Sequence, residues 1–294
     1  MSCTTTKGAG PLLLRLAPLL IPFALLFCGG ILLTGLQSLG VATPIPSPLS
    51  SGQAYHRLFS DPIFYQTLVF SLFVALCSAL GAVFCALLLS YGLWRLPAHL
   101  TRFSLVYKIP LILPHIAVAF VIMLIWSRTG ILASMSYHLG LISTSLDFPN
   151  VLYSGWGLGM ILAYILKGTP FAMLLISALL VSFDPRLMFT ARMLGASRLR
   201  AFFQVFLPHL WPAVNTAFII LFLYAFGAFD IPFLLGESKP EMLSIRVYTL
   251  YFQKSLARRP EAMAILVIMF VFAVAFIALY TQAVQGLRSS ERKV

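Results

Sequence analysis

Apolar residues follow one another along this 294-residue chain in long runs, separated by short polar segments. A helix needs about 20 mostly apolar residues to cross a bilayer. Six runs reach that length, near residues 12–36, 64–90, 105–126, 153–181, 210–235 and 262–285. The pattern therefore predicts six membrane-spanning helices, the first of them close to the start of the chain.

Composition supports the same class of protein. The chain is 60% hydrophobic and only 10% charged, whereas ordinary soluble domains carry about 25% charged residues. We therefore expect an all-α polytopic membrane protein. Neither an internal repeat of 20 to 50 residues nor a low-complexity tract interrupts it, so we expect one membrane domain over residues 1–294, with core spans at 64–285.

The net charge of +12 could suggest a nucleic-acid partner, but the basic residues occupy short loops between apolar runs. In such loops Lys and Arg set the orientation of the chain. The first, third and fifth loops carry seven basic residues offset by five acids. The second and fourth loops (91–104 and 182–209) and both termini are rich in Lys and Arg. Together they contain only two acidic residues, Asp184 and Glu291. The bias predicts that these segments and both termini are cytoplasmic, with no nucleic-acid partner.

The fourth loop contains a compact basic insert, "FTARMLGASRLRAFFQVFLPHLWP". Asp184 and Pro185 just before it are typical of a helix start, with a capping carboxylate followed by proline at the first helical position. Leu187, Ala191 and Leu194 recur at i, i+4 and i+7, which predicts one apolar face.

A second short helix is expected after a tight elbow. Gly195 can adopt the left-handed conformation that closes a helix, and Ser197 can cap the next one. Pro208 and Pro212 are expected to limit that helix and lead into the fifth span. Such an insert could lie in the membrane interface and hold anionic lipid with its arginines. Alternatively, it could dock into a groove on another protein.

This insert resembles the cytoplasmic motif of binding-protein-dependent ABC importer permeases, E-A-A-x-x-x-G followed 13 residues later by proline. The positions that match it are Ala191, Gly195, Ala196, Ser197, Phe202, Leu207, Pro208 and Pro212, with Pro185 and Leu187 in the lead-in. The chain departs from the motif where Phe189 replaces the glutamate and Thr190 the first alanine. A weaker similarity, in "FGAFDIPFLLGE" and "FCALLLSYGLWR", is to permeases of the spermidine/putrescine and Fe(III)/phosphonate types.

The resemblance implies a type I importer permease in the bacterial inner membrane, forming half of a translocation pathway. It implies three partner proteins: a cytoplasmic ABC ATPase, a second permease subunit and a solute-binding protein outside the membrane, besides membrane lipid. It also implies that the fourth loop is the coupling helix. The residues it assigns to ATPase coupling are Leu187, Phe189, Thr190, Ala191, Gly195, Ala196, Ser197 and Pro208.

Chemistry-bearing motifs do not point to an enzyme. The sequence holds no G-x-x-x-x-G-K-[ST] phosphate loop, no His pair at i, i+4 and no G-x-S-x-G. We therefore expect no catalytic residue, cofactor or metal, and ATP hydrolysis on a separate subunit. A secondary transporter and a membrane scaffold remain alternatives; the former predicts matching halves with broken helices, which the sequence does not display.

Two charged residues fall within expected spans, Lys167 and Asp230. Charges at membrane depth are costly and often face a cavity or a partner, so both are candidates for the translocation path, paired with each other or separate. There are structural alternatives for both residues. Asp230 could lie near the outer end of its span, and the Lys167 side chain could extend along its stem toward the membrane surface. Gly168 and Pro170 predict a kink in the fourth span, from packing or from solute contact.

Overall fold

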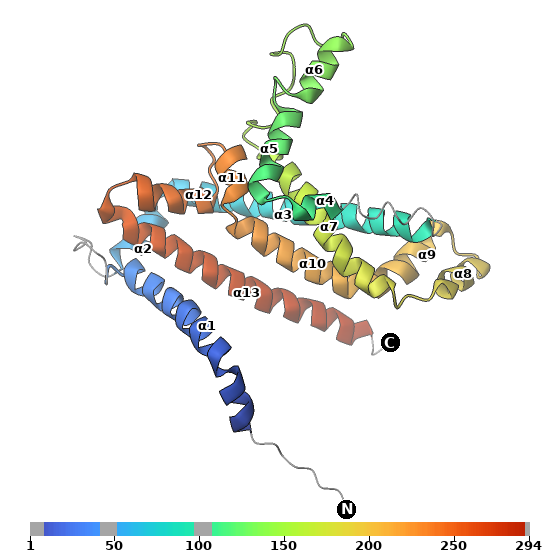
Figure 1. The fold of residues 1–294 in the computed structure, drawn as a ribbon, viewed down its shortest axis with the longest axis horizontal. Helices are drawn as coiled ribbons and strands as arrows, with labels where there is room; N and C mark the ends of the chain where they lie inside the picture. The colour runs from blue at the N-terminus through green and yellow to red at the C-terminus, as the bar shows by residue number, and fades with distance from the viewer. Residues whose placement is uncertain (1–8, 42–51, 97–107, 292–294) are drawn as a thin grey trace, which may run out of the picture. The chain divides into compact units, whose positions relative to one another are not determined.

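The computed structural model describes residues 9–41, 52–96 and 108–291, and every regular element in these ranges is a helix (Figure 1). Six helical stretches within them are long and apolar enough to cross a membrane. They are Leu16–Ser38, Pro62–Arg95, His115–His138, Leu158–Leu180, Arg198–Gly227 and Leu256–Val284. The predicted all-α fold with six membrane helices is confirmed. Most of the loop expected at 91–104 lies outside the described residues.

The chain divides into two compact units, one made of residues 1–62 and 247–294 and the other of residues 63–246. In the first unit, α1 (Ala9–Ser38) packs along α13 (Arg259–Glu291), and α2 (Gln53–Ser60) also lies against α13. The apolar side chains along α1 are exposed in the protein alone, as expected of a helix that faces lipid. The single domain over residues 1–294 stays a prediction.

A buried carboxylate lies at the start of α13, where α2 packs against this helix. Glu261 at the start of α13 is 4% exposed and accepts two hydrogen bonds from Arg258, at 3.0 and 2.7 Å. Arg57 on α2 approaches the same carboxylate at 3.9 Å. Because a buried charge is tolerated only when it is paired and hydrogen-bonded, Arg258 satisfies Glu261 locally, and Arg57 adds a longer contact between α2 and the start of α13.

In the second unit, α7 (Leu158–Leu180) packs against α10 (Leu207–Gly227) and α5 (His115–Trp126). Buried residues of α3 (Pro62–Arg95) join the same core. Gly168 lets three of them meet closely. A Cβ at this position would stand 3.0 Å from Cβ of Ala82 on α3 and 3.1 Å from Leu221 on α10. Although Pro170 lies inside α7, the helix is continuous from Leu158 to Leu180, so the fourth span is not unwound.

The third span differs from the expected run at 105–126. It begins as a one-turn helix, α4 (Ile109–Ile112), and restarts as α5 after Leu113 and Pro114. Pro114 is the physical reason, because a residue before proline is driven away from helical geometry. Beyond α5 follows a short helix, α6 (Ile131–His138), which packs against α5 and projects away from the rest of this unit (Figure 1).

The loop after α6 is ordered by an acidic side chain. Asp147 accepts hydrogen bonds from the backbone N–H groups of Thr144 at 2.8 Å and Ser143 at 3.0 Å. These bonds, with that of Thr144 first, lower the pKa of its carboxyl. The carboxylate therefore keeps its charge in this turn, outside the membrane-spanning segments.

The elbow in the fourth loop forms as predicted. Asp184 caps α8 (Pro185–Met193) by accepting the backbone N–H of Arg186 at 2.9 Å. Gly195 then takes the left-handed conformation, with φ of 88°. The next N–H, of Ala196, returns to the carbonyl of Ala191 at 3.0 Å, as in a Schellman motif. Ser197 Oγ accepts the N–H of Arg200 at 3.2 Å and starts α9 (Arg198–Ala201).

The prediction that Pro208 and Pro212 limit the second helix is wrong. From Arg198 to Gly227 the chain is one helical stretch, with a π-helical turn, η2 (Phe202–Phe206), directly before α10. In that turn the N–H of Leu207 bonds to the carbonyl of Phe202, five residues back. The wider turn shifts the preceding carbonyls relative to the proline ring, so the helix continues where an ordinary α-turn would clash.

The fifth span also ends earlier than expected. α10 stops at Gly227 and a separate helix, α11 (Asp230–Leu235), follows. Ala228 in the break keeps a partner, because its carbonyl accepts the Ser244 hydroxyl at 2.7 Å. Asp230 thus begins a short helix instead of lying within a span. The chain continues through α12 (Leu243–Tyr248), η3 (Thr249–Gln253) and η4 (Leu256–Arg258) into α13.

The elbow conformation makes Gly195 sensitive to substitution. No atom lies within 4 Å of the position that a Cβ would take, so the cost is backbone strain alone. We expect Gly195→Val to destabilise the fourth loop by about 1–2 kcal/mol, because a left-handed backbone crowds a side chain. Gly195→Asn should cost less, since asparagine tolerates this conformation. Melting temperature and limited proteolysis of the purified protein measure both; equal behaviour of the two variants would contradict the strain argument.

Candidate functional site

The fourth loop presents large apolar side chains outward. Leu187, Phe189 and Leu194 are 52, 67 and 83% exposed. Surface residues of this kind normally occur singly, yet these three belong to one short segment. Exposed apolar side chains on a tightly capped helix are suited to docking against another protein.

The opposite side of the loop is packed inward, and here the structure corrects the expected face. Ala191 is half-buried against the core with Ala196, not on the exposed face with Leu187 and Leu194. The anchor is Met188, which is 8% exposed and which sequence reasoning missed. Met188 precedes Ala191 by three residues, and this spacing, which places both on one helix face, could have indicated it. Thr190 is exposed and donates its hydroxyl to the carbonyl of Arg186 at 3.0 Å.

An aromatic cluster joins this loop to the membrane helices. Phe206 is fully buried and its ring lies 5.0 Å from Tyr91 and 5.4 Å from Trp94, both on α3. Phe183 at the end of the fourth span lies 5.4 Å from the same ring. Aromatic rings pack in edge-to-face contacts at these separations. The sequence did not single out these side chains, because none belongs to a recognisable motif.

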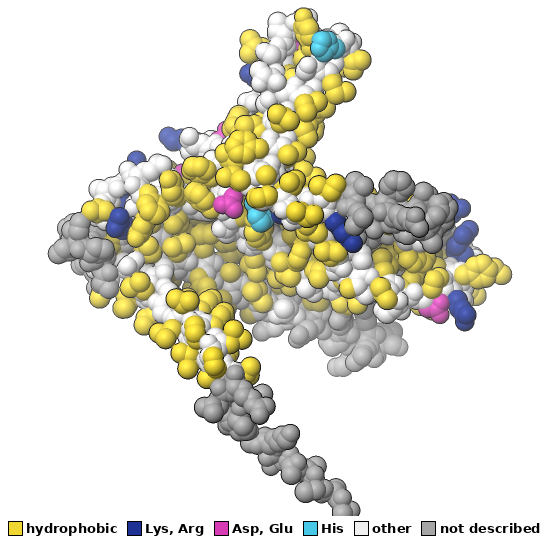
Figure 2. Space-filling view, viewed as in Figure 1, with side chains coloured by type: hydrophobic (Ala, Val, Ile, Leu, Met, Phe, Trp, Pro, Cys, Tyr) yellow, Lys and Arg dark blue, Asp and Glu magenta, His cyan; other side chains and the backbone are white. Residues whose placement is uncertain are grey.

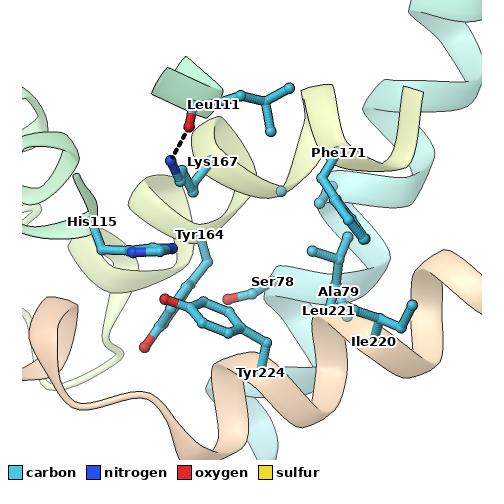
Figure 3. A pocket seen from close by; sticks show the side chains of 12 residues that line it. Ser78, Ala79, Leu111, His115, Tyr164, Lys167, Phe171, Ile220, Leu221 and Tyr224 are labelled. Carbon is cyan, nitrogen blue, oxygen red and sulfur yellow. Dashed lines mark hydrogen bonds between the residues drawn. The ribbon is translucent and has the colours of Figure 1, made fainter. Parts of the chain in front are cut away.

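A second candidate region is a cavity of about 280 Å³ among α3, α4, α5, α7 and α10 (Figure 3). Its wall is mainly apolar and aromatic, with rings from Tyr164, Phe171, Tyr224 and His115. The His115 and Tyr224 rings lie 5.0 Å apart. Concave sites with apolar walls and a few polar groups are typical of small-molecule binding.

Lys167 borders the cavity and holds the broken start of the third span. Its ammonium donates to the carbonyls of Pro110 at 2.8 Å, Leu111 at 3.0 Å and Leu113 at 2.6 Å. An ammonium has three donors, so all of them are used. The structure does not pair Lys167 with Asp230, which lies outside the lining of the cavity. Sequence reasoning could not foresee carbonyl partners more than 50 residues away.

Two hydroxyl groups in the cavity wall have no hydrogen-bond partner among the described residues. These are the buried Tyr164 Oη and Ser78 Oγ. Buried polar groups nearly always have partners in native proteins, and water or a bound solute can supply one. Figure 3 shows both side chains beside Tyr224, so hydroxyl groups from three helices border one space.

Known transport proteins resemble most of this chain. The sulfoquinovosyl glycerol transport system permease protein SmoG of Agrobacterium fabrum is 26% identical over 266 residues, which cover 86% of this chain and 82% of that protein. The spermidine/putrescine transport system permease protein PotB of Escherichia coli is 27% identical over 187 residues, covering 63% and 66%.

The fold is shared with a solved transporter. A chain of a bacterial ABC transporter that imports the acidic polysaccharide alginate superposes with a TM-score of 0.76 at 21% identity, covering 94% of this chain and 95% of that one. Residues 62–289 match the family described as the inner membrane component of binding-protein-dependent transport systems. The chain therefore belongs to this family, as a permease subunit of an ABC importer.

Proposed function

We propose that residues 182–209 couple the separate ATPase subunit to the membrane helices of this permease. The observation that carries the proposal is the two-sided loop. Leu187, Phe189 and Leu194 face outward, while Met188 and Phe206 are buried against the core. A partner that binds the exposed side chains also displaces the buried ones, because a packed interior transmits strain.

The same helices carry this displacement to the cavity. The core cluster under the loop includes Ala172 and Met173 of α7 and Leu210 of α10. One turn or more further along, α7 supplies Lys167 to the cavity wall and α10 supplies Tyr224. A rigid-body movement of these helices changes the shape of the cavity, as alternating access requires.

We place the solute pathway along this cavity, and its chemistry favours a hydroxyl-bearing solute. Tyrosine and phenylalanine rings offer flat apolar faces, and Tyr164 and Ser78 offer unpartnered hydroxyls. The charge of Lys167 opposes a polycation such as the polyamines for which PotB is named. A sugar-like solute, as in the name of SmoG, matches the wall better. Asp230 lies outside the lining of this cavity, so we assign it no direct contact with the solute there.

The membrane orientation proposed here puts both termini and residues 182–209 in the cytoplasm. It rests on the excess of Lys and Arg in those segments. The ATPase then meets the exposed apolar tips of the fourth loop. The loops near Lys239 face the solute-binding protein.

Thiol labelling tests the orientation. In a background without Cys3, Cys28, Cys77 and Cys85, we expect Lys239→Cys to react with an impermeant reagent in intact cells. Leu199→Cys should react only after the membrane is permeabilised, although this side chain is 72% exposed. The reverse pattern would invert the orientation and remove the coupling role of the fourth loop.

Truncation at the outer face tests the docking. Burying a large apolar side chain contributes about 1.5–3 kcal/mol, whereas an exposed ion pair contributes about 0–1 kcal/mol. We therefore expect Phe189→Ala to reduce the ATPase retained on the purified permease more than Arg198→Ala does. Retention measured at low and high salt separates the two contributions. If Arg198→Ala and high salt each release the ATPase while Phe189→Ala retains it, the docking is electrostatic instead.

Removing one unpartnered hydroxyl tests the cavity. Tyr164→Phe should raise the melting temperature of the solute-free protein, because an unsatisfied buried hydroxyl is destabilising. It should also raise KM for uptake by about fivefold, the equivalent of one lost hydrogen bond. Tyr280→Phe, outside the cavity lining, serves as the control. Unchanged KM together with a raised melting temperature would show that the solute does not bind this hydroxyl.

A further inference from the structure

A small basic pocket lies beside the docking face of the fourth loop. Its volume is about 160 Å³, and its charged lining comes from Arg95 at the end of α3, Arg192 on α8 and Arg198 on α9. Aromatic and apolar walls complete it, from Tyr91, Trp94, Met188 and Phe189. Figure 2 shows Lys and Arg side chains gathered over this end of the second unit.

These three guanidinium groups have no carboxylate partner in the part of the chain that the structure describes. Arg95 instead lies over the ring of Tyr91, at 5.5 Å from its centroid. Asp184 is the sole acid in the fourth loop, and its side chain is used to cap α8. The sequence from Leu96 to Lys108 contains no Asp or Glu. An anion that binds in this pocket therefore has to come from another molecule.

The position of the pocket points to the membrane surface. α3 has 34 residues, which at 1.5 Å per residue is about 51 Å, enough to cross the hydrocarbon core of about 30 Å and reach the headgroup region. Tyr91 and Trp94 lie in its last turns, and tyrosine and tryptophan are enriched at headgroup level. The aromatic cluster with Phe206 and Phe183 holds Trp94 in place, so this wall of the pocket is fixed.

We propose that the pocket binds the phosphate of an anionic phospholipid. Guanidinium groups match phosphate oxygens with pairs of hydrogen bonds, and the Trp94, Met188 and Phe189 walls suit the glycerol and the first methylenes of the chains. A protein carboxylate would use the charge but not these apolar walls. A free phosphate ion has the same oxyanion chemistry but likewise leaves the apolar walls without a partner.

The site adds a regulatory contact to the proposed coupling role. Phe189 borders the pocket and is also an outward tip of the loop. A lipid phosphate seated beside it holds α8 and α9 against the end of α3 and sets the angle of the docking face. ATP hydrolysis by the assembled importer then depends on anionic lipid in the cytoplasmic leaflet.

The test uses the assembled transporter, with its ATPase and second permease subunit, in phosphatidylcholine vesicles with or without phosphatidylglycerol. Native mass spectrometry counts phosphatidylglycerol retained after extraction. We expect the double variant R192Q/R198Q to bind this lipid about 25-fold more weakly, at about fivefold for each guanidinium near the surface. The matched control is R186Q/R200Q, which removes the same charge from α8 and α9 outside the pocket lining.

Five results would contradict all or part of the proposal. Equal loss of lipid in both double variants would show a general surface charge effect instead of a site. Full lipid retention by R192Q/R198Q would also refute it, and loss of the ATPase in that variant would assign the arginines to carboxylates of the partner. Displacement of the lipid by millimolar inorganic phosphate, without preference for phosphatidylglycerol, would show a free-anion site. ATP hydrolysis that is independent of phosphatidylglycerol would remove the regulatory role while leaving the proposed coupling by Phe189 to its own test.

Discussion

The burial of Phe206 is the contact on which the rest of the second unit depends. Its ring is enclosed by Tyr91 and Trp94 from α3 and by Phe183 from the end of the fourth span. Met188 extends the same cluster into α8. Since a close-packed cluster cannot deform without losing contacts, the fourth loop and the ends of three helices move as one body. The proposed coupling needs this property, because a displacement of residues 182–209 has to reach the helices around the cavity.

Backbone polar groups at membrane depth impose the second constraint. Wherever a span breaks, the freed carbonyls require partners, since lipid supplies none. Lys167 donates three hydrogen bonds to the carbonyls freed before α5. Ser244 donates one to the carbonyl freed after α10. A charge within a span thus has a structural function as well as a place beside the cavity. Lys167 is of functional interest because it lies next to hydroxyl groups that have no hydrogen-bond partner in the part of the chain that the structure describes.

Charged side chains are arranged differently around Glu261 and around the fourth loop. Around Glu261, arginines and a buried carboxylate satisfy one another within the first unit. On α8 and α9, Arg192 and Arg198 have no carboxylate partner among the described residues and lie beside exposed apolar side chains. Exposed groups that the chain leaves unsatisfied are those available to other molecules. The replacement of the motif glutamate by Phe189 follows the same trend, since it removes an acid from this surface and adds an apolar side chain.

The sequence by itself determined the six spans, the all-helical class and the elbow of the fourth loop. These features depend on local chemistry: run length in lipid, the Asp184 cap, the proline after it and the left-handed glycine. The spacing of the motif residues in the fourth loop also carried the resemblance to importer permeases. Tertiary structure decided which residues face inward, so that Met188 rather than Leu187 anchors α8, and that the helix passes through Pro208. It also decided that Lys167 binds backbone carbonyls and that Tyr164 and Ser78 share a cavity. These outcomes depend on groups brought together from distant parts of the chain, and no local pattern records which of them will meet.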